Sequence, residues 1–422
     1  MTALASNRFP WRIVALLMAL CFISHMNRVS MSVAGNSRIM AQYGFSPTEM
    51  GTVYSAFLLV YTIFMIPGGF FIDRFGPRLA LLVMGGGSAL FGALTGAVGL
   101  GWTIAGRALL TLILIRGLMG LLTTPLHPAS AHAVNLWTAV PQRSLANGLV
   151  TGAALLGIAC TYPIFGALIR HFDWPGAFLA TGVVTILLAL IWTVTAKDEA
   201  LRRAAAEALP ETRAGTLGSS SWLDLLADRN LILLTVSYAA VGYFQYLFFY
   251  WMQYYFDQVL HIGKTRSEFF AGLPPLAMAL GMPLGGWISD RLQRRCGFRW
   301  GRALVPVVGL LLSAVCLGIG IFVKTPNAIV AWFSLALGVM GASEGSFWST
   351  AVELGRQRDG TAAAIMNTGG NGGGMLAPVV TPWVSGLFGW PVGIAIGSAV
   401  CLAGAVCWLG INPSRNDPAK DI

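Results

Sequence analysis

The sequence predicts an all-α membrane protein with twelve transmembrane helices arranged as two pseudo-symmetric six-helix bundles. Apolar residues make up 56% of the 422-residue chain and charged residues only 10%, a composition typical of membrane proteins. Runs of roughly 20 apolar residues, enough to cross a hydrocarbon core of about 30 Å, recur along the whole chain. Three unrelated motifs also return about half a chain length later, which indicates two homologous halves.

The repeated motifs share nearly the same offset of 216 or 217 residues. They are the Gly-Gly…Asp-Arg motif at 68–74 and 285–291, the Phe-x-Trp-Pro motif at 172–175 and 388–391, and the Thr-Gly pair at 151–152 and 368–369. Parallel repeats within a membrane are typical of transporters whose halves move around a central site.

The N-terminal six-helix bundle is expected over residues 1–196. Its first helix follows Arg8 and Arg12, but the run is longer than a signal peptide and lacks an Ala-x-Ala cleavage site, so we interpret it as a retained span. Five apolar runs of similar length follow it. The six predicted spans are 11–33, 50–72, 79–99, 103–126, 145–169 and 176–196.

A cytoplasmic linker is expected over 197–229, where the chain is rich in Ala, Glu and Arg and then in Gly and Ser. The C-terminal six-helix bundle is expected over 230–422. Its first helix is rich in aromatic residues, its fourth carries Glu344 and its fifth contains a run of glycines. The six predicted spans are 230–257, 267–289, 303–323, 327–350, 362–387 and 391–411.

The basic residues predict the orientation of the chain. Its formal net charge is +10, and most of its 27 Lys and Arg lie on the same side as the two termini. By the positive-inside rule both termini are therefore cytoplasmic. The charges are spread over short loops, which excludes a nucleic-acid-binding patch. Six cysteines without a CxxC motif predict neither a disulfide framework nor a metal site.

A family resemblance covers nearly the whole chain. The run Gly-Gly-x-x-x-Asp-Arg-x-Gly-Pro-Arg at 68–78 resembles the loop signature between the second and third helices of the major facilitator superfamily. Residues 54–69 resemble the second helix of its anion:cation symporter branch, which includes bacterial sugar-acid transporters and vertebrate phosphate and glutamate carriers. The resemblance implies the major facilitator fold, a monomer in a bacterial inner membrane and a small organic anion as substrate.

The loop signature predicts a cytoplasmic gate. Asp73 and Asp290 occupy equivalent helix ends in the two halves, each followed by arginine. Such carboxylates can pair with guanidinium groups and with a helix N-terminus while the cytoplasmic side is closed. Anchoring of helix ends in the headgroup layer is the alternative. The predicted gate residues are Asp73, Arg74, Arg78, Asp290 and Arg291.

Two arginines within predicted spans are the leading candidates for binding an anion. An arginine near the middle of a span costs about 2.5–3.5 kcal/mol on insertion scales, so it needs a partner or a polar cavity. Arg116 has apolar neighbours on both sides, whereas Arg28 lies in the outer part of the first span. Members of the resembled branch use arginines at both places for their substrate. A structural bond to backbone carbonyls is the alternative for each.

The family's two proton-coupling carboxylates are absent from this chain. The branch usually has Asp-Arg in its first helix, but Asn27 stands there, and the acid expected in the fourth helix is replaced by Thr123. Glu344 is the prominent acid within a span, and it serves either as a proton carrier or as a structural partner. His25 and His127 are further proton-coupling candidates, with a single structural hydrogen bond as the alternative.

Polar and aromatic residues that interrupt the apolar spans are expected to line a substrate cavity. They are Tyr61, Gln245, Ser346, Trp348, Asn367 and Asn371. The two asparagines belong to a stretch with five glycines in eight residues. Such a run predicts a flexible segment that lines the cavity, and close packing of two helices is the alternative.

We therefore expect uptake of a sugar acid, an aromatic acid or a dicarboxylate by alternating access, coupled to protons or another cation such as sodium. The alternatives are a metabolite or drug exporter, an uncoupled facilitator and a transporter-like sensor. An enzyme is not expected, because no paired nucleophile and base and no metal cluster lie within a span. No cofactor is expected.

Overall fold

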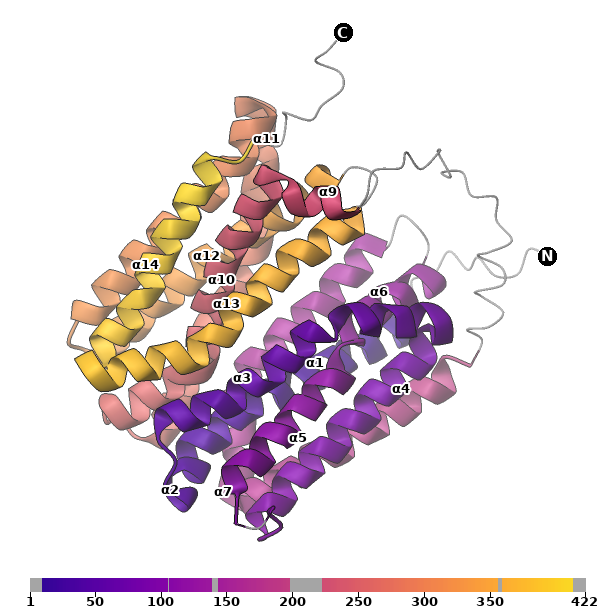
Figure 1. The fold of residues 1–422 in the computed structure, drawn as a ribbon, viewed down its shortest axis with the longest axis vertical. Coiled ribbons are helices and arrows are strands. Elements are labelled where there is room, and N and C mark those ends of the chain that lie inside the picture. Colours follow the sequence, from indigo (N-terminus) through magenta and orange to yellow (C-terminus); the bar gives the residue numbers. More distant parts are fainter. Residues whose placement is uncertain (1–9, 105, 139–142, 198–221, 356–358, 413–422) are drawn as a thin grey trace. The chain divides into compact units, whose positions relative to one another are not determined.

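A computed structural model of the protein describes residues 10–104, 106–138, 143–197, 222–355 and 359–412 (Figure 1). Within these ranges the chain forms helices and no strands, so the predicted all-α class is confirmed. The helices are α1 (Trp11–Ala34), the π-helix η1 (Gly35–Ile39), α2 (Met40–Tyr43), α3 (Pro47–Ile63), α4 (Met65–Gly99), α5 (Ala108–Thr123), α6 (Leu126–Trp137), α7 (Arg143–Thr195), α9 (Trp222–Ala227), α10 (Arg229–Tyr254), the π-helix η3 (Tyr255–Val259), α11 (Lys264–Phe322), α12 (Pro326–Gly355), α13 (Asp359–Phe388) and α14 (Trp390–Leu409).

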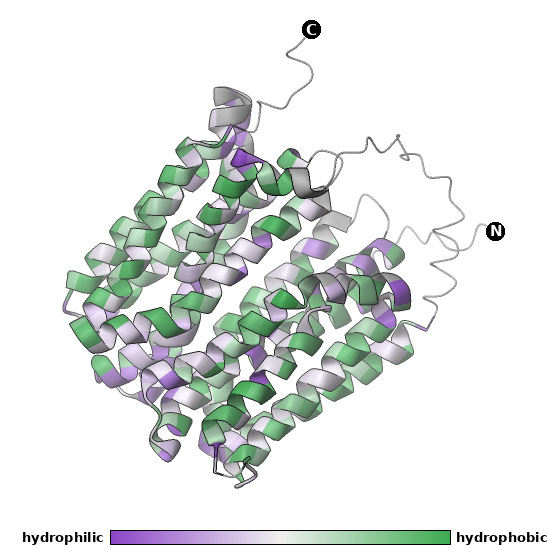
Figure 2. Ribbon diagram, in the orientation of Figure 1, coloured by the Kyte–Doolittle hydropathy of each residue, from purple (hydrophilic) through white to green (hydrophobic). Residues whose placement is uncertain are grey.

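Nine helical stretches among the described residues are long and apolar enough to cross a membrane, and hydrophobic residues, in green, recur along the helices in Figure 2. Twelve spans were predicted, and the difference has local causes. The stretch Ala146–Thr195 covers two predicted spans, which meet at a non-helical residue, Asp173. Helix α3 has only 17 residues, and the polar, glycine-rich middle of α13 lowers its hydropathy.

The chain divides into two compact units. Unit 1 comprises residues 1–46 and 56–214, and unit 2 comprises residues 47–55 and 215–422. The first half of α3 belongs to unit 2 through its side chains, because Tyr54 stacks on Tyr250 with ring centroids 4.9 Å apart and Ser55 Oγ donates to the carbonyl oxygen of Met375 at 2.7 Å. Most of the linker predicted over 197–229 lies outside the described residues.

The repeated Phe-x-Trp-Pro motif encodes a sharp turn between consecutive helices. Asp173 has φ 54° and ψ 174°, and its counterpart Gly389 has φ 88° and ψ 158°. Positive φ with extended ψ is a region that essentially only glycine occupies without strain. In each copy the next helix begins at the following Trp-Pro, because proline suits the first turn of a helix. Asp173 therefore has a backbone conformation that favours glycine, the residue found at the equivalent position 389.

Helix α5 ends inside a membrane span, and α6 continues the same span after a two-residue interruption. Pro125 has no N–H to donate, so the ladder of backbone hydrogen bonds is broken there. Thr124 Oγ1 donates to the carbonyl oxygen of Leu121 at 2.8 Å and satisfies one group at the break. Helix α4 passes close by, since a Cβ on Gly68 would lie 2.7 Å from Thr124 Oγ1. His127 follows this break directly.

In unit 2 the glycine run of α13 packs against α10. A Cβ on Gly373 would lie 1.8 Å from the carbonyl oxygen of Ala239, and one on Gly370 would lie 2.7 Å from the ring of Tyr238. On the facing helix, a Cβ on Gly242 would lie 1.8 Å from the carbonyl oxygen of Gly370. Helix α13 is continuous through the run. The glycines therefore bring two backbones together, as in the packing alternative, and the helix is not unwound.

Candidate functional site

In unit 1, Arg116 ties α5 to the C-terminal half of α1. Its side chain is almost fully buried, with 1% exposed. Its Nη2 donates to the carbonyl oxygen of Arg28 at 2.8 Å, and its Nη1 lies 3.4 Å from that of Asn27 and 3.2 Å from the sulfur of Met119. Arg116 was predicted to bind an anion. It makes the bonds to backbone carbonyls that were expected if its role were structural instead. These bonds fix the helix turn that carries Arg28.

Arg28 itself is half-buried against aromatic side chains of α3. Its Cζ lies over the rings of Phe57 and Tyr61, 5.1 and 5.2 Å from their centroids, and the two rings stack at 5.9 Å. Cation–π contacts of this kind use the flat face of a guanidinium group, whereas a carboxylate binds along its N–H edge. The structure therefore brings two of the predicted residues, Arg28 and Tyr61, into one cluster with Arg116.

Asn27 and Thr123, which stand where the resemblance leads us to expect carboxylates, both make neutral hydrogen bonds. Asn27 Nδ2 donates to Thr185 Oγ1 of α7 at 2.8 Å. Thr123 Oγ1 donates to the carbonyl oxygen of Met119, one turn back in α5, at 2.6 Å. Both side chains are buried. Asn27 therefore joins α1 to α7, whereas Thr123 bonds within its own helix, and neither side chain can ionise.

The two candidate histidines contact each other. His25 of α1 and His127 of α6 lie with their Nε2 atoms 3.3 Å apart and their rings in an edge-to-face arrangement with centroids 5.0 Å apart. His25 Nδ1 lies 2.9 Å from the carbonyl oxygen of Cys21. Cys21 in turn contacts Ser130 of α6, with the two side-chain atoms 3.7 Å apart. Sequence analysis identified both histidines as candidates but did not predict that they contact each other.

In unit 2, Glu344 of α12 is the centre of a buried hydrogen-bond network. Tyr238 of α10 donates to its Oε2 at 2.9 Å, and Gln245 of the same helix donates to its Oε1. Trp348, one turn further along α12, is a third partner. Only 4% of the glutamate is exposed. Two of the predicted lining residues, Gln245 and Trp348, thus contact the predicted acid directly.

The other predicted residues of unit 2 are Ser346, Asn367 and Asn371. Ser346 is buried and donates to Ser289 of α11 at 3.1 Å, so it joins two helices. Asn367 is half-buried on α13. Asn371, one turn later, is 7% exposed, and its Nδ2 has no hydrogen-bond partner among the described residues. A buried amide donor without a hydrogen bond lowers the stability of the fold, so the Nδ2 group of Asn371 is a candidate to donate a hydrogen bond to a bound solute.

The predicted gate is only partly visible. The side chains of Asp73 and Asp290 lie outside the described part of the chain. Arg78 Nε donates to the carbonyl oxygen of Thr193 in α7 at 2.9 Å. Arg74 and Arg291 lie over the neighbouring rings of Phe75 and Trp287, with Cζ 5.4 and 3.9 Å from the ring centroids.

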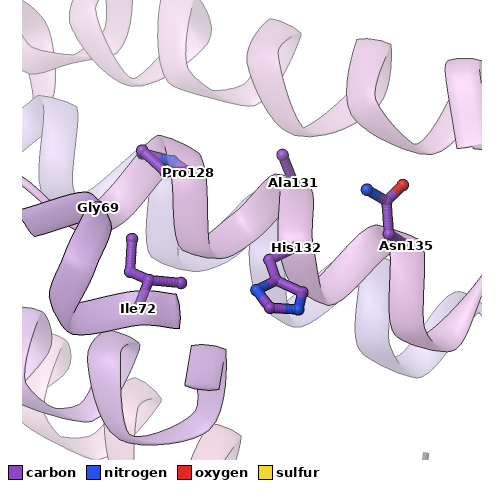
Figure 3. Close-up of a pocket in the computed structure, with 6 residues that line it drawn as sticks. All are labelled: Gly69, Ile72, Pro128, Ala131, His132 and Asn135. Atoms are coloured by element: carbon purple, nitrogen blue, oxygen red, sulfur yellow. The ribbon is translucent and has the colours of Figure 1, made fainter. Parts of the chain in front are cut away.

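A separate pocket of about 300 Å³ lies between α4 and α6 in unit 1. Gly69 and Ile72 line it from α4, and Pro128, Ala131, His132 and Asn135 line it from α6 (Figure 3). Gly69 and Ile72 belong to the 68–78 signature, and none of the lining residues is one predicted to bind substrate.

Sequence reasoning missed two residues that complete the clusters. Tyr238 holds the predicted acid, and Phe57 lies under both arginines, 5.1 Å from Arg28 and 5.4 Å from Arg116. Phe57 stands one helical turn before Tyr61, so its spacing could have indicated a shared face. Tyr238 is one of many aromatic residues in α10, and no signal in the sequence singled it out.

These features define a multi-span membrane protein with buried charged groups held by polar networks in both of its units, the class to which small-solute transporters belong. The chain belongs to the Major Facilitator Superfamily, whose family model matches residues 17–354.

Among its relatives, a probable sulfoacetate transporter of Cupriavidus necator is 28% identical over 414 residues, which cover 95% of this chain and 93% of the relative. A D-galactonate transporter of Escherichia coli O6:H1 is 28% identical over 413 residues, 92% of each chain. A crystal structure of a bacterial homologue of the human lysosomal transporter Spinster, inward-facing and occupied, matches with a TM-score of 0.78 over 99% of both chains. At 15% identity it shows the fold alone.

Proposed function

We propose that this protein is a secondary transporter that moves a small organic anion across a bacterial inner membrane by alternating access. The observation that carries the proposal is the cluster of Arg28 and Arg116 in unit 1. The first 196 residues contain only three acidic residues, Glu49, Asp73 and Asp173, so a buried cationic cluster there suits an anion. The relatives are named for transporting sulfoacetate and D-galactonate, and both anions carry a carboxylate.

Within the cluster the two arginines have different roles. Arg28 binds the carboxylate through its N–H edge, because its faces meet aromatic rings. Arg116 holds the backbone of α1 at Arg28, and Tyr61 offers a hydroxyl group beside the guanidinium. In unit 2, Asn371 offers an amide donor for hydroxyl or carboxylate groups of a substrate.

The architecture that accompanies this function is also a proposal. The two six-helix bundles, residues 1–196 and 230–422, move so that the substrate site opens to one side of the membrane at a time. Both termini and the linker are cytoplasmic. The protein acts as a monomer without enzymatic activity. The gate residues act at the cytoplasmic ends of their helices; they are Asp73, Arg74 and Arg78, with Asp290 and Arg291 in the second half. Positive-inside charge and the repeated signature support this arrangement.

The alternative is an uncoupled facilitator or an exporter. Asn27 and Thr123 favour it, since both are engaged in neutral hydrogen bonds and neither can carry a proton. Proton-coupled uptake requires another titratable group, and Glu344, His25 and His127 are the candidates.

Counterflow in proteoliposomes tests the function. Vesicles loaded with unlabelled sulfoacetate or D-galactonate are placed in labelled anion, with neutral galactose as the control solute. We expect anion exchange in wild type, its loss in Arg28→Ala and its retention in Arg38→Ala, which removes an arginine whose carboxylate partner, Asp173, is largely exposed. Exchange of galactose alone, or of no anion in a wider carboxylate panel, would refute the organic-anion assignment.

A further inference from the structure

We propose that the His25–His127 pair is the proton site that couples anion transport to the proton gradient in this protein, in place of the family's carboxylates. The inference rests on the proposed function and deepens it. It starts from the contact between the two Nε2 atoms, 3.3 Å apart, which joins α1 to α6 beside the break in the span.

The hydrogen bond on the far side of His25 fixes where the protons are. A carbonyl oxygen can only accept, so His25 Nδ1, 2.9 Å from the carbonyl of Cys21, carries a hydrogen. In the neutral ring, His25 Nε2 is then an acceptor, and the hydrogen between the rings belongs to His127 Nε2. The lone pair of His127 Nδ1 is left as the acceptor of the neutral pair.

Proton uptake follows from this arrangement without breaking the contact. A proton from the aqueous side binds His127 Nδ1 and makes that ring an imidazolium. The hydrogen on His127 Nε2 can then pass to His25 Nε2, which leaves His127 neutral and His25 charged. The pair gains one proton and one positive charge, and release reverses the same steps. Asn27 and Thr123, on the same two spans, offer no such acceptor.

Arg28 links the proton to the anion. It lies three residues after His25 on the same face of α1, and its charge acts on both imidazole rings. A second positive charge beside it is opposed by Coulomb repulsion. An anion bound at Arg28 offsets that repulsion, so anion and proton each favour the binding of the other.

The remaining surroundings of the pair leave this linkage in place. Cys21 faces His25 on α1, Tyr61 lies beneath Arg28 from α3, and Arg116 reaches α1 from α5. From α7, Thr185 bonds Asn27 with a neutral hydroxyl group. Helices α4 and α7 add apolar side chains such as Met84 and Ala154 to the core cluster that contains Cys21. Arg28 and Arg116 are the charged groups among these residues.

The test compares exchange with accumulation in the same proteoliposomes. His127→Gln can still donate an amide hydrogen to His25, but it cannot take up a proton. His132→Gln, five residues along α6 in the separate pocket, is the matched control. The probe is labelled D-galactonate or sulfoacetate, whichever wild type exchanges. With one proton per anion and the membrane potential clamped at zero, a gradient of one pH unit, acid outside, gives about tenfold accumulation of either probe.

We expect about tenfold accumulation in wild type and His132→Gln, and none above equilibration in His127→Gln and His25→Gln, while counterflow exchange continues in all four. A pH indicator should also record uptake of one proton per bound anion by wild type in detergent and none by His127→Gln. Accumulation that survives in both histidine variants, or loss of exchange together with accumulation, overturns the inference. Failure of wild type to exchange any anion instead overturns the proposed function on which the inference rests.

Discussion

Replacing single neighbouring glycines of α13 tests the contact between α13 and α10. Gly372 and Gly373 are consecutive, so their side-chain positions point in different directions. A Cβ on Gly373 would meet the carbonyl oxygen of Ala239 at 1.8 Å, whereas one on Gly372 has no atom within 4 Å among the described residues. The variants Gly373→Ala and Gly372→Ala therefore add the same methyl group to a tight and to an open position of one helix.

The magnitude follows from the contact distances. Cβ atoms essentially never approach closer than 3.0 Å, so the backbones would have to separate by 3.0 − 1.8 = 1.2 Å at Gly373. Overpacking of this kind costs about 1–3 kcal/mol. At Gly372 the same change brings only the better helix propensity of alanine, worth about 1 kcal/mol. For a unit of this size each kcal/mol shifts the unfolding temperature by about 2–4 °C.

The assay is thermal unfolding of purified protein in detergent, followed by tryptophan fluorescence. Gly373→Ala should unfold several degrees below wild type, and Gly372→Ala should unfold at the wild-type temperature or slightly above it. Equal shifts in the two variants would refute the inferred backbone contact, because the substitutions differ only in the direction of one methyl group.

Three further substitutions give distinct outcomes. Asp173→Gly should raise stability by about 1 kcal/mol by relieving backbone strain, since the ion pair it loses to Arg38 is exposed and contributes little; a lower unfolding temperature would contradict this. Arg116→Ala should abolish anion exchange and lower the unfolding temperature, because it removes the bonds to the α1 backbone, and an unchanged temperature would argue against the tether. Glu344→Gln should lower the free energy of unfolding by about 1–3 kcal/mol, because an amide N–H then faces the donor of Tyr238 or Gln245. The variant should nevertheless keep accumulation driven by a pH gradient. Loss of that accumulation at normal stability would place the proton site in unit 2.

The fold was predictable because the bilayer sets a fixed length for an apolar helix. The turn at Asp173 falls in the gap between the predicted spans 145–169 and 176–196, and the structure adds that Asp173 and its counterpart Gly389 both have positive φ. The direction of the glycines in α13 was not predictable. A glycine run permits either unwinding or close packing, and only the facing residues of α10, such as Ala239, decide between them.

The candidate site was predictable in its residue types and only partly in its contacts. Hydropathy marks an arginine within a span as significant, but it does not say where the side chain points. It therefore left open whether Arg116 binds a ligand or the backbone. The meeting of His25 and His127 depends on how α6 begins after Pro125, and one sequence holds no information on contacts between such distant positions.

The bond from Arg116 to α1 has an evolutionary consequence because it is made to the backbone. Carbonyl oxygens are present whatever side chains residues 27 and 28 carry, so mutation of those side chains does not remove the anchor. The side chains at these two positions can therefore change without loss of the bonds that tie this turn of α1 to α5.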